Sequence, residues 1–542
     1  MIENPETQAL KQAINQLNIA EWPYEILGVT AATVGQLEFG KALRHYPKTE
    51  KRAAELIQKK FKNYLSFNAA TNVWYFWNGR IHKPTESIVL VTKVVHQLWT
   101  ALSGAMDLLD DLIDGIVAQS PDNEKKARRK ELRGQVSEHR YLRDSLSKSG
   151  GISSLIKALE SHLDIPGDYF ANDTRWFVVQ NGVFDMDDVR KTREWKLLPH
   201  DGSRPVYREW KFKYNPGSTH EHLDHFLETS IEDESQARFL QKILGTAVFG
   251  TRPDEGTRSF VSIQGKPRSG KSMILRVLNS FCEENTFVRE PQVSAIIKRG
   301  KNPEHGRNPM KEARIAAFTE VTEHLERMFM LKYSGGDKCT SEDKYIKNTS
   351  WYPQGVVFLF SNHGAPIDKT DKATYDRLKP INFPHQFELP PFDDGVHTLD
   401  PKLQDKIVSQ GSGFLEWLME GFIRGLDEDF YCSESMERLK QGERDEQDEV
   451  GIYLADRLDS GHLRYEENAP GYRCVNLTKA YADYKLWHGQ HGSGRPVPRL
   501  LFSERLSSRY ELKGWDGTGK RMTFAGLILS DGIDMRMSDP DR

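Results

Sequence analysis

The segment that most constrains this chain is a glycine-rich turn between an apolar run and an amphipathic run. Residues 260–263 are apolar, residues 265–272 read Gly-Lys-Pro-Arg-Ser-Gly-Lys-Ser, and a pattern with helical spacing follows. This is G-x-x-x-x-G-K-[ST] in a strand–turn–helix context, in which backbone N–H groups and a helix N-terminus surround phosphate oxygens. Because both flanks have the required pattern, a chance match in a surface turn is a poor alternative. We therefore expect nucleotide binding at this turn.

The side chains of the turn suggest separate roles. Lys271 would reach the β- and γ-phosphates, and the Ser272 hydroxyl would hold Mg²⁺. The implied cofactors are ATP and Mg²⁺. The residues predicted to bind the nucleotide are Gly265, Lys266, Pro267, Arg268, Ser269, Gly270, Lys271 and Ser272.

Three polar residues mark the ends of apolar runs further along the chain. Glu320 ends one run and is predicted to act on Mg²⁺ and the attacking water, and Asn362 ends another and is predicted to contact the γ-phosphate or that water. Arg377 precedes a third run and would neutralise transition-state charge in a neighbouring subunit, an effect on the order of 10³–10⁵ in rate. We predict that Lys271, Glu320, Asn362 and Arg377 are catalytic, with Arg252 and Arg258 as secondary candidates for the arginine. Strand-like and helical runs alternate over residues 257–388, which predicts a parallel α/β core.

Composition narrows the class of protein. The 542 residues suggest about three or four domains. Lys+Arg is 75 and Asp+Glu is 78, so the net charge of −3 excludes a uniformly basic polyanion-binding surface but not cations concentrated in one channel. No run approaches 18 apolar residues and the first residues are polar, so we expect no membrane span and no signal peptide. Four widely spaced cysteines indicate reduced thiols and a cytoplasmic location rather than zinc or disulfides.

The order of these motifs resembles that of superfamily 3 helicases, and more narrowly that of the phage and plasmid primase-helicase family related to the poxvirus primase-helicase. Between the Glu320 and Asn362 runs, residues 331–337 read LKYSGGD and residues 343–345 read DKY. Lys344 stands where the family usually has Arg, and Ser269 where it commonly has Asn. Residues 74–79 (WYFWNG) and 181–185 (NGVFD) resemble features of the domain before the helicase. Residues 477–492, 501–515 and 520–529 resemble a winged-helix appendage.

The resemblance implies a multidomain α/β fold with a P-loop ATPase core of the AAA+-like, superfamily 3 type, a helical or mixed N-terminal domain and a C-terminal winged-helix-like domain. We expect a helical segment at 1–65, a pre-helicase α+β domain at 66–230, the ATPase core at 231–390, a helical extension or linker at 391–449 and the last domain at 450–542. The roughly 65 residues before the aromatic stretch leave no room for a primase domain. A separate primase or polymerase is therefore a candidate partner.

The same resemblance implies a homo-hexameric ring that moves on single-stranded or forked DNA in a phage-, prophage- or plasmid-bearing bacterial cell, without a membrane partner. A hairpin after residue 331 would face the central channel. Tyr345 or Trp351 would stack on a base there, with burial in the core as an equal alternative. The candidate phosphate contacts, which hold DNA without reading its sequence, are Lys332, Lys338, Lys344 and Lys347.

Several functions share these motifs. The first prediction is an ATP-hydrolysing DNA helicase in phage or plasmid replication. The alternatives are an ATP-driven DNA translocase or switch without unwinding activity, and a non-catalytic DNA-binding or initiation module. A small-molecule kinase fits least.

Four other clusters have simpler interpretations. His220, His222 and His225 are predicted to be solvated or capping residues rather than metal ligands, and residues 185–188 (DMDD) a turn rather than a catalytic acid pair. The basic run 125–133 is predicted to be a solvated helix face, with DNA contact as the alternative. The polar face of an amphipathic helix is the expected place of Asp107, Asp110, Asp111 and Asp114.

Overall fold

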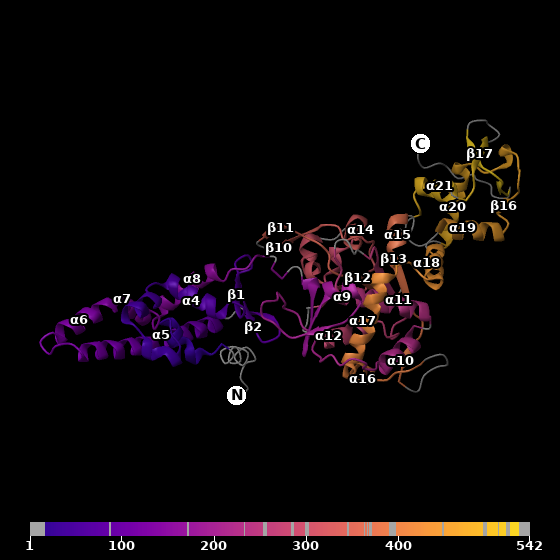
Figure 1. Cartoon of the computed structure of the whole chain (residues 1–542). Helices are drawn as coiled ribbons and strands as arrows, with labels where there is room; N and C mark the ends of the chain where they lie inside the picture. Colours follow the sequence, from indigo (N-terminus) through magenta and orange to yellow (C-terminus); the bar gives the residue numbers. More distant parts are fainter. Residues whose placement is uncertain are drawn as a thin grey trace. The chain divides into compact units, whose positions relative to one another are not determined.

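The computed structural model contains two compact units (Figure 1). Unit 1 comprises Met1–Asp368 and Ala373–Tyr431, and unit 2 comprises Lys369–Lys372 and Cys432–Arg542. Unit 2 thus takes in a helix that precedes the boundary we drew at residue 450. The structure describes residues 17–85, 88–167, 169–170, 173–231, 233–252, 257–282, 287–298, 303–343, 346–362, 364–365, 367, 371–389, 397–446, 449–491, 496–507, 509–515 and 521–530.

The N-terminal part of unit 1 is a helical core with a small antiparallel sheet. The sheet has the order β1-β2-β3, from β1 (Leu65–Asn68), β2 (Val73–Trp77) and β3 (His82–Thr85). Thr49 caps the N-terminus of α4 by accepting a hydrogen bond from the Arg52 N–H. The helices are η1 (Ile19–Glu21), α2 (Trp22–Ile26), η2 (Ala31–Gln36), α3 (Phe39–His45), α4 (Glu50–Phe61), α5 (Ile88–Ala118), α6 (Lys125–Gln135), α7 (Ser137–Ser145) and α8 (Ser149–His162).

The long helix α5 is the centre of this core. Its buried side chains recur at helical spacing from Leu90 to Val117 and pack with those of the surrounding helices. By length and hydropathy alone, α5 is long and apolar enough to cross a membrane, which the sequence analysis did not anticipate. One such helix is weak evidence, because the central helix of a helical core has the same properties.

A second small antiparallel sheet, in the order β4-β5-β6, follows the helical core. The predicted turn at Asn181 and Gly182 is confirmed between β4 (Trp176–Val179) and β5 (Gly182–Asp185). Asp185 then caps α9 by accepting a hydrogen bond from the Asp187 N–H. The other elements here are η3 (Asp173–Arg175), α9 (Met186–Thr192) and β6 (Leu197–Leu198).

The predicted parallel α/β core is confirmed by a five-stranded sheet in which every neighbouring pair is parallel. Its order is β13-β7-β12-β9-β8. The strands are β7 (Phe260–Gly265), β8 (Val288–Arg289), β9 (Ile315–Thr319), β12 (Val356–Ser361) and β13 (Leu378–Phe383). Their side chains are almost all buried, as in a parallel sheet covered on both faces.

Helices and a hairpin surround this sheet. α11 and α17 approach closely at Gly245, which has no Cβ. A Cβ there would lie 2.4 Å from the Leu418 carbonyl oxygen. The antiparallel hairpin consists of β10 (Cys339–Asp343) and β11 (Ile346–Trp351). A separate short pair, β14 (Phe387–Glu388) and β15 (His397–Thr398), is parallel. The helices are α10 (Glu221–Ser230), α11 (Glu234–Phe249), α12 (Met273–Ser280), η4 (Val293–Ala295), α13 (Pro303–Gly306), η5 (Asn308–Glu312), α14 (Arg327–Gly335), α15 (Lys372–Arg377), α16 (Leu403–Ser409) and α17 (Gly411–Asp427).

Unit 2 has its own hydrophobic core, which includes Tyr453, Tyr484, Trp487 and Phe502. Inside it, Arg457 and Asp483 form a buried ion pair of 3.1 Å, and the Tyr453 hydroxyl donates to the same carboxylate at 2.8 Å. Its strands form the antiparallel pairs β16–β19 and β17–β18. The elements are α18 (Glu434–Glu446), α19 (Glu449–Asp459), β16 (Leu463–Tyr465), η6 (Gly471–Arg473), α20 (Leu477–His491), α21 (Arg499–Ser507), β17 (Leu512–Trp515), β18 (Met522–Phe524) and β19 (Leu527–Leu529).

Candidate nucleotide site

The glycine-rich turn lies at the carboxyl end of β7 and leads directly into α12. In open parallel sheets, ligands bind in the crevice at this edge. Gly265 has φ 150°, and a Cβ there would lie 2.2 Å from the Phe383 carbonyl oxygen of β13. Gly270 has φ 87°, with the Phe226 ring of α10 3.0 Å from its ideal Cβ position. Both glycines are therefore required by backbone conformation and close packing.

The Lys271 side chain folds back over this turn. Its Nζ donates hydrogen bonds to the Gly265 carbonyl, to the Lys266 carbonyl at 2.8 Å and to the Ser269 hydroxyl at 3.3 Å. Burial lowers the pKa of the Lys271 amine below its ordinary value, because removal of water disfavours the charged form. The Lys271 amine therefore lies among the backbone groups of the turn, at the N-terminus of α12.

The strand order brings Asn362 and Glu320 to the same edge of the sheet. β12 lies between β7 and β9, so Asn362, just after β12, lies beside the turn, and its Oδ1 is 3.3 Å from Lys271 Nζ. Glu320 follows β9, has φ 56° and donates its backbone N–H to the Phe360 carbonyl at 3.0 Å. A positive φ at a non-glycine residue costs about 1–3 kcal/mol and is often retained at functional positions. The structure therefore brings together three of the four predicted catalytic residues.

The residues predicted to hold Mg²⁺ fit a hard cation. Ser272 and Glu320 are both exposed, and each offers an oxygen donor. Among the described residues, no group of three or more His, Cys, Asp or Glu side chains is arranged to hold a metal. Mg²⁺ sites commonly use one or two protein oxygens together with substrate phosphates and water.

Arg377 lies at the opposite edge of the sheet. It directly precedes β13, whose first residue, Leu378, pairs with Phe260 at the amino end of β7. Its Nη1 donates to the Leu331 carbonyl and, at 3.0 Å, to the Ser334 hydroxyl of α14. Burial and, secondarily, the charge of Arg258 lower the pKa of its guanidinium. Within one chain, Arg377 is therefore separated from Lys271 by the length of the sheet.

The two secondary arginine candidates differ in their surroundings. Arg258 lies close enough to Arg377 for its positive charge to lower the pKa of the Arg377 guanidinium. Arg252 forms an ion pair with Asp187 of α9. Arg252 is thus part of the packing of a neighbouring element.

A strap that holds the glycine-rich turn was missed by sequence reasoning. The Phe387 N–H donates to the Arg268 carbonyl at 3.0 Å, and the Gln386 side chain donates to the Pro267 carbonyl at 3.1 Å. Glu388 forms an ion pair of 2.6 Å with Arg268. These partners are about 120 residues apart, and the sequence between them contains no pattern that pairs them.

The candidate DNA contacts lie in α14 and in the segment that follows it, up to and including the β10–β11 hairpin. Lys332 and Lys338 are exposed, in the last turn of α14 and just before β10 respectively. Lys344 and Tyr345 lie outside the described residues, and only the backbone of Lys347 is described, within β11. Trp351 is 5% exposed, and its indole N–H donates to the Ser341 hydroxyl at 3.1 Å. Of the two alternatives for Trp351, the structure supports the core residue.

The remaining clusters have structural roles. His220 pairs with Asp224 at 2.9 Å, next to the N-terminus of α10. Asp110 pairs with Arg140, and Asp114 with Arg129 at 3.0 Å, as expected for the polar face of α5. The prediction of a turn at residues 185–188 is wrong, because Asp185 ends β5 and the next three residues form the first turn of α9. Asp185 and Asp187 also pair with Arg175.

Comparisons with known proteins agree with part of this interpretation. Residues 54–232 match the family model described as "D5 N terminal like". Over 175 residues, the chain is 25% identical to "Putative helicase L207/L206" of Acanthamoeba polyphaga mimivirus, a match that covers 31% of this chain and 18% of that protein. The likeness is to a D5-like helicase/primase family. The chain aligns with less than a fifth of that relative's length.

Solved structures of the C-terminal region of NrS-1 also match. The apo structure in its A form covers 60% of this chain and 81% of its own, with 14% identity and a TM-score of 0.34. A structure of its residues 305–718 in the same form covers 59% and 79%, with 12% identity and a TM-score of 0.35.

Proposed function

We propose that this protein is an ATP-dependent DNA helicase or translocase of the superfamily 3 type that acts in phage or plasmid DNA replication. The observation that carries the proposal is the position of Lys271 Nζ, inside the glycine-rich turn and 3.3 Å from Asn362 Oδ1, with the Glu320 carboxylate one strand further along the same edge. The likeness to D5-like helicases and primases supports the choice of nucleic acid as the second substrate.

The residues of this edge divide the work of hydrolysis. Backbone N–H groups of residues 266–272 bind the phosphates, while Lys271 exchanges its carbonyl partners for β- and γ-phosphate oxygens. Asn362 orients the γ-phosphate or the attacking water, and the exposed Glu320 carboxylate accepts the proton of that water. The Ser272 hydroxyl and the Glu320 carboxylate would hold Mg²⁺, which would supply positive charge to the phosphates.

The protein is proposed to form a ring, taken as a homo-hexamer from the family resemblance, in which Arg377 acts between subunits. Because Arg377 is at the amino edge of the sheet, its proposed role on transition-state charge requires the nucleotide of a neighbouring subunit. Lys332 and Lys338, with Lys344 and Lys347, are proposed to contact single-stranded DNA in the ring channel. Unit 2 is proposed to be a winged-helix-like appendage, and a separate primase or polymerase a further partner in the cytoplasm of the host cell.

The proposal is tested with the purified full chain by ATP hydrolysis with and without single-stranded DNA, and by strand displacement on a forked substrate. Lys271→Ala is expected to lose nucleotide binding, and Glu320→Gln to bind ATP but hydrolyse it roughly 100-fold more slowly or worse. Glu323→Gln, an exposed carboxylate three residues further on, is the matched control and is expected to retain wild-type rates.

The outcomes separate the alternatives. If DNA stimulates hydrolysis but no strand is displaced, the protein is a translocase or switch and not a helicase. If Glu320→Gln loses hydrolysis but keeps wild-type biological activity, the protein is a non-catalytic DNA-binding or initiation module, and neither a helicase nor a translocase. Hydrolysis that Lys271→Ala leaves unchanged would contradict the nucleotide site itself.

A further inference from the structure

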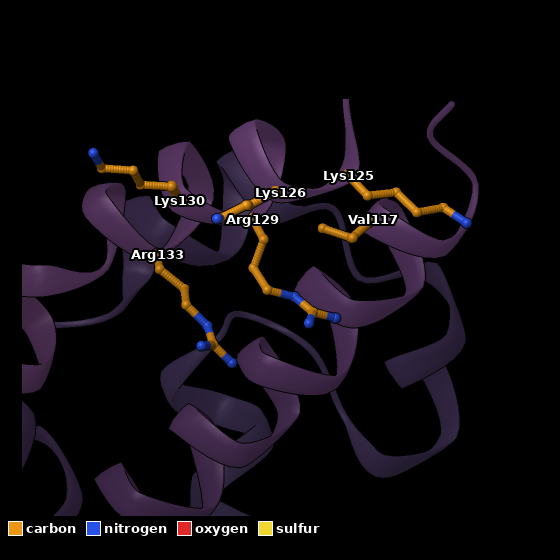
Figure 2. Close-up of a pocket in the computed structure, with 6 residues that line it drawn as sticks. All are labelled: Val117, Lys125, Lys126, Arg129, Lys130 and Arg133. Carbon is orange, nitrogen blue, oxygen red and sulfur yellow. The ribbon is translucent and has the colours of Figure 1, made fainter. Parts of the chain in front are cut away.

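A strongly basic pocket lies where α5 ends and α6 begins, at the surface of the helical core. Its volume is about 580 Å³. Figure 2 shows the guanidinium groups of Arg129 and Arg133 extending from α6 in the same general direction. One apolar residue of α5 and five basic residues line it: Val117, Lys125, Lys126, Arg129, Lys130 and Arg133.

Few acidic side chains balance these charges. α6 carries six basic residues and one acidic residue, Glu131, a net charge of +5 over eleven residues in a chain whose net charge is −3. Lys125 pairs with Asp122 at 2.6 Å and Arg129 with Asp114 at 3.0 Å. Lys126, Lys130 and Arg133 form no ion pair or hydrogen bond through their side chains with another described residue. Three positive charges therefore remain available to an external anion.

The placement of these residues works against the stability of α6. The first turn of α6 begins with Lys125 and Lys126 and contains no acidic residue, and the carboxylates at this end, Asp122 and the N-cap Glu124, precede the helix. Lys126 and Lys130 are also like charges four residues apart, which repel each other on a helix. An anion bound along this face of α6 reduces the repulsion between the lysines.

The spacing of the charges fits a duplex backbone. Residues 125, 126, 129, 130 and 133 share one face of the helix and span about 12 Å along its axis. One strand of B-DNA presents about three to four phosphates over that axial length. The match predicts contact with phosphates in a row rather than with a single anion.

The residues that line the pocket fit single strands, membranes and peptides less well than duplex DNA. No aromatic side chain is among the lining residues, so the pocket lacks the aromatic platforms on which single-strand-binding proteins stack successive bases. Leu132, the only large apolar residue of α6, is buried, so α6 lacks the exposed apolar face by which interfacial helices enter membranes. Val117 alone gives too little apolar surface to anchor the side chains of a docked peptide.

We propose that this surface, defined by Lys125, Lys126, Arg129, Lys130 and Arg133, binds the phosphate backbone of duplex DNA without reading its sequence. It is a second DNA contact, distinct from the proposed single-strand channel and independent of ATP hydrolysis. Such a contact holds the paired part of a substrate while another part of the protein acts on it.

The test measures the affinity of the full chain for a 30-base-pair blunt duplex as a function of salt. The variant Lys126→Gln/Lys130→Gln/Arg133→Gln removes the three unpaired charges. Each lost phosphate contact lowers the slope of log K against log salt by about 0.9, so we expect a slope smaller by about 2–3 and an affinity at least tenfold lower at 0.1 M salt. The variant is expected to keep the wild-type circular dichroism spectrum, because all three side chains are exposed.

The matched control removes the same charge from another helix of the same core, as Lys51→Gln/Lys59→Gln/Lys62→Gln, at exposed positions of α4 and its C-cap. The control is expected to bind the duplex with the wild-type slope. Equal losses in both variants, or none in either, would overturn the proposal. So would an α6 variant that loses binding to phosphatidylserine vesicles or to an acidic peptide while duplex binding is unchanged.

Two further measurements keep this proposal separate from the proposed function. Lys271→Ala is expected to bind the duplex like the wild type, and the α6 variant to retain ATP hydrolysis stimulated by single-stranded DNA within about twofold. If the proposed nucleotide site is wrong, the duplex measurement can therefore still be interpreted. Loss of duplex binding in Lys271→Ala would contradict the proposal that the α6 surface binds DNA independently of the nucleotide site.

Discussion

Replacement of Gly265 by alanine tests how the glycine-rich turn is held. The backbone at Gly265 has φ 150°, which side-chain-bearing residues rarely adopt, and it pairs with Phe383 at the end of β13. A Cβ at this position would lie 2.2 Å from the Phe383 carbonyl oxygen and 3.0 Å from the Phe383 Cβ. Because the nearest obstacle is backbone, β7 and β13 must separate by about 1 Å before normal contact distances return.

Two terms set the size of the expected effect. The unfavourable φ costs about 1–3 kcal/mol. The close contact adds about 1–3 kcal/mol, as in other overpacked sites. The free energy of unfolding should therefore fall by about 2–6 kcal/mol, and the turn should shift because its first residue moves with β7.

Gly79→Ala separates the two terms. Gly79 has φ 96°, but nothing lies within 4 Å of its ideal Cβ position, so only the backbone cost applies. The assays are urea unfolding of the full chain and titration with a fluorescent ATP analogue. We expect Gly265→Ala to unfold at lower urea than Gly79→Ala and to bind the nucleotide at least tenfold more weakly, whereas Gly79→Ala binds it normally. Gly265→Ala with wild-type stability and affinity would refute the argument from Phe383.

Three further predictions concern other parts of the molecule. Asp483→Asn should lower the free energy of unfolding by about 3–5 kcal/mol in urea titrations, because it leaves the buried Arg457 guanidinium without its carboxylate; an unchanged midpoint would contradict this. Burial lowers the pKa of His82 to about 4, so the folded state binds fewer protons than the unfolded state between pH 6.5 and 4. Stability should therefore fall by up to about 3 kcal/mol as the pH drops through this window, and His82→Gln should lack that part of the pH dependence in unfolding midpoints. Arg377→Ala should bind ATP normally but hydrolyse it on the order of 10³-fold more slowly. Mixing it with Lys271→Ala should restore activity, because some sites then combine an intact turn with an intact arginine; no recovery would refute action between subunits.

The strand–turn–helix at residues 260–280 could be predicted because the spacing of its glycines permits few other folds. The position of Asn362 could also be predicted in outline, since an apolar run that ends in a polar residue places that residue at a sheet edge. Its closeness to Lys271 depends on β12 pairing directly with β7, and strand order is a tertiary property that the local pattern does not contain.

Other features had no signal that could be read locally. The strap from Gln386 to Glu388 depends on contacts over about 120 residues, and one of these uses a backbone N–H that every non-proline residue has. The basic pocket was visible as a charge run at 125–133, but a solvated helix face has the same sequence pattern. Only the fold shows which of these cations share one cavity with Val117.

β13 has a consequence for how a ring of these subunits would operate. It directly follows Arg377, which is proposed to act on a neighbour's nucleotide, and its last residue, Phe383, packs against Gly265 of the subunit's own turn. The strand is six residues long, about 20 Å, and is paired with β7 along its whole length. A fully paired strand moves as a rigid rod, so a displacement of Arg377 also displaces Phe383. In the proposed ring, successive nucleotide sites would thereby be connected in series, each through a single strand.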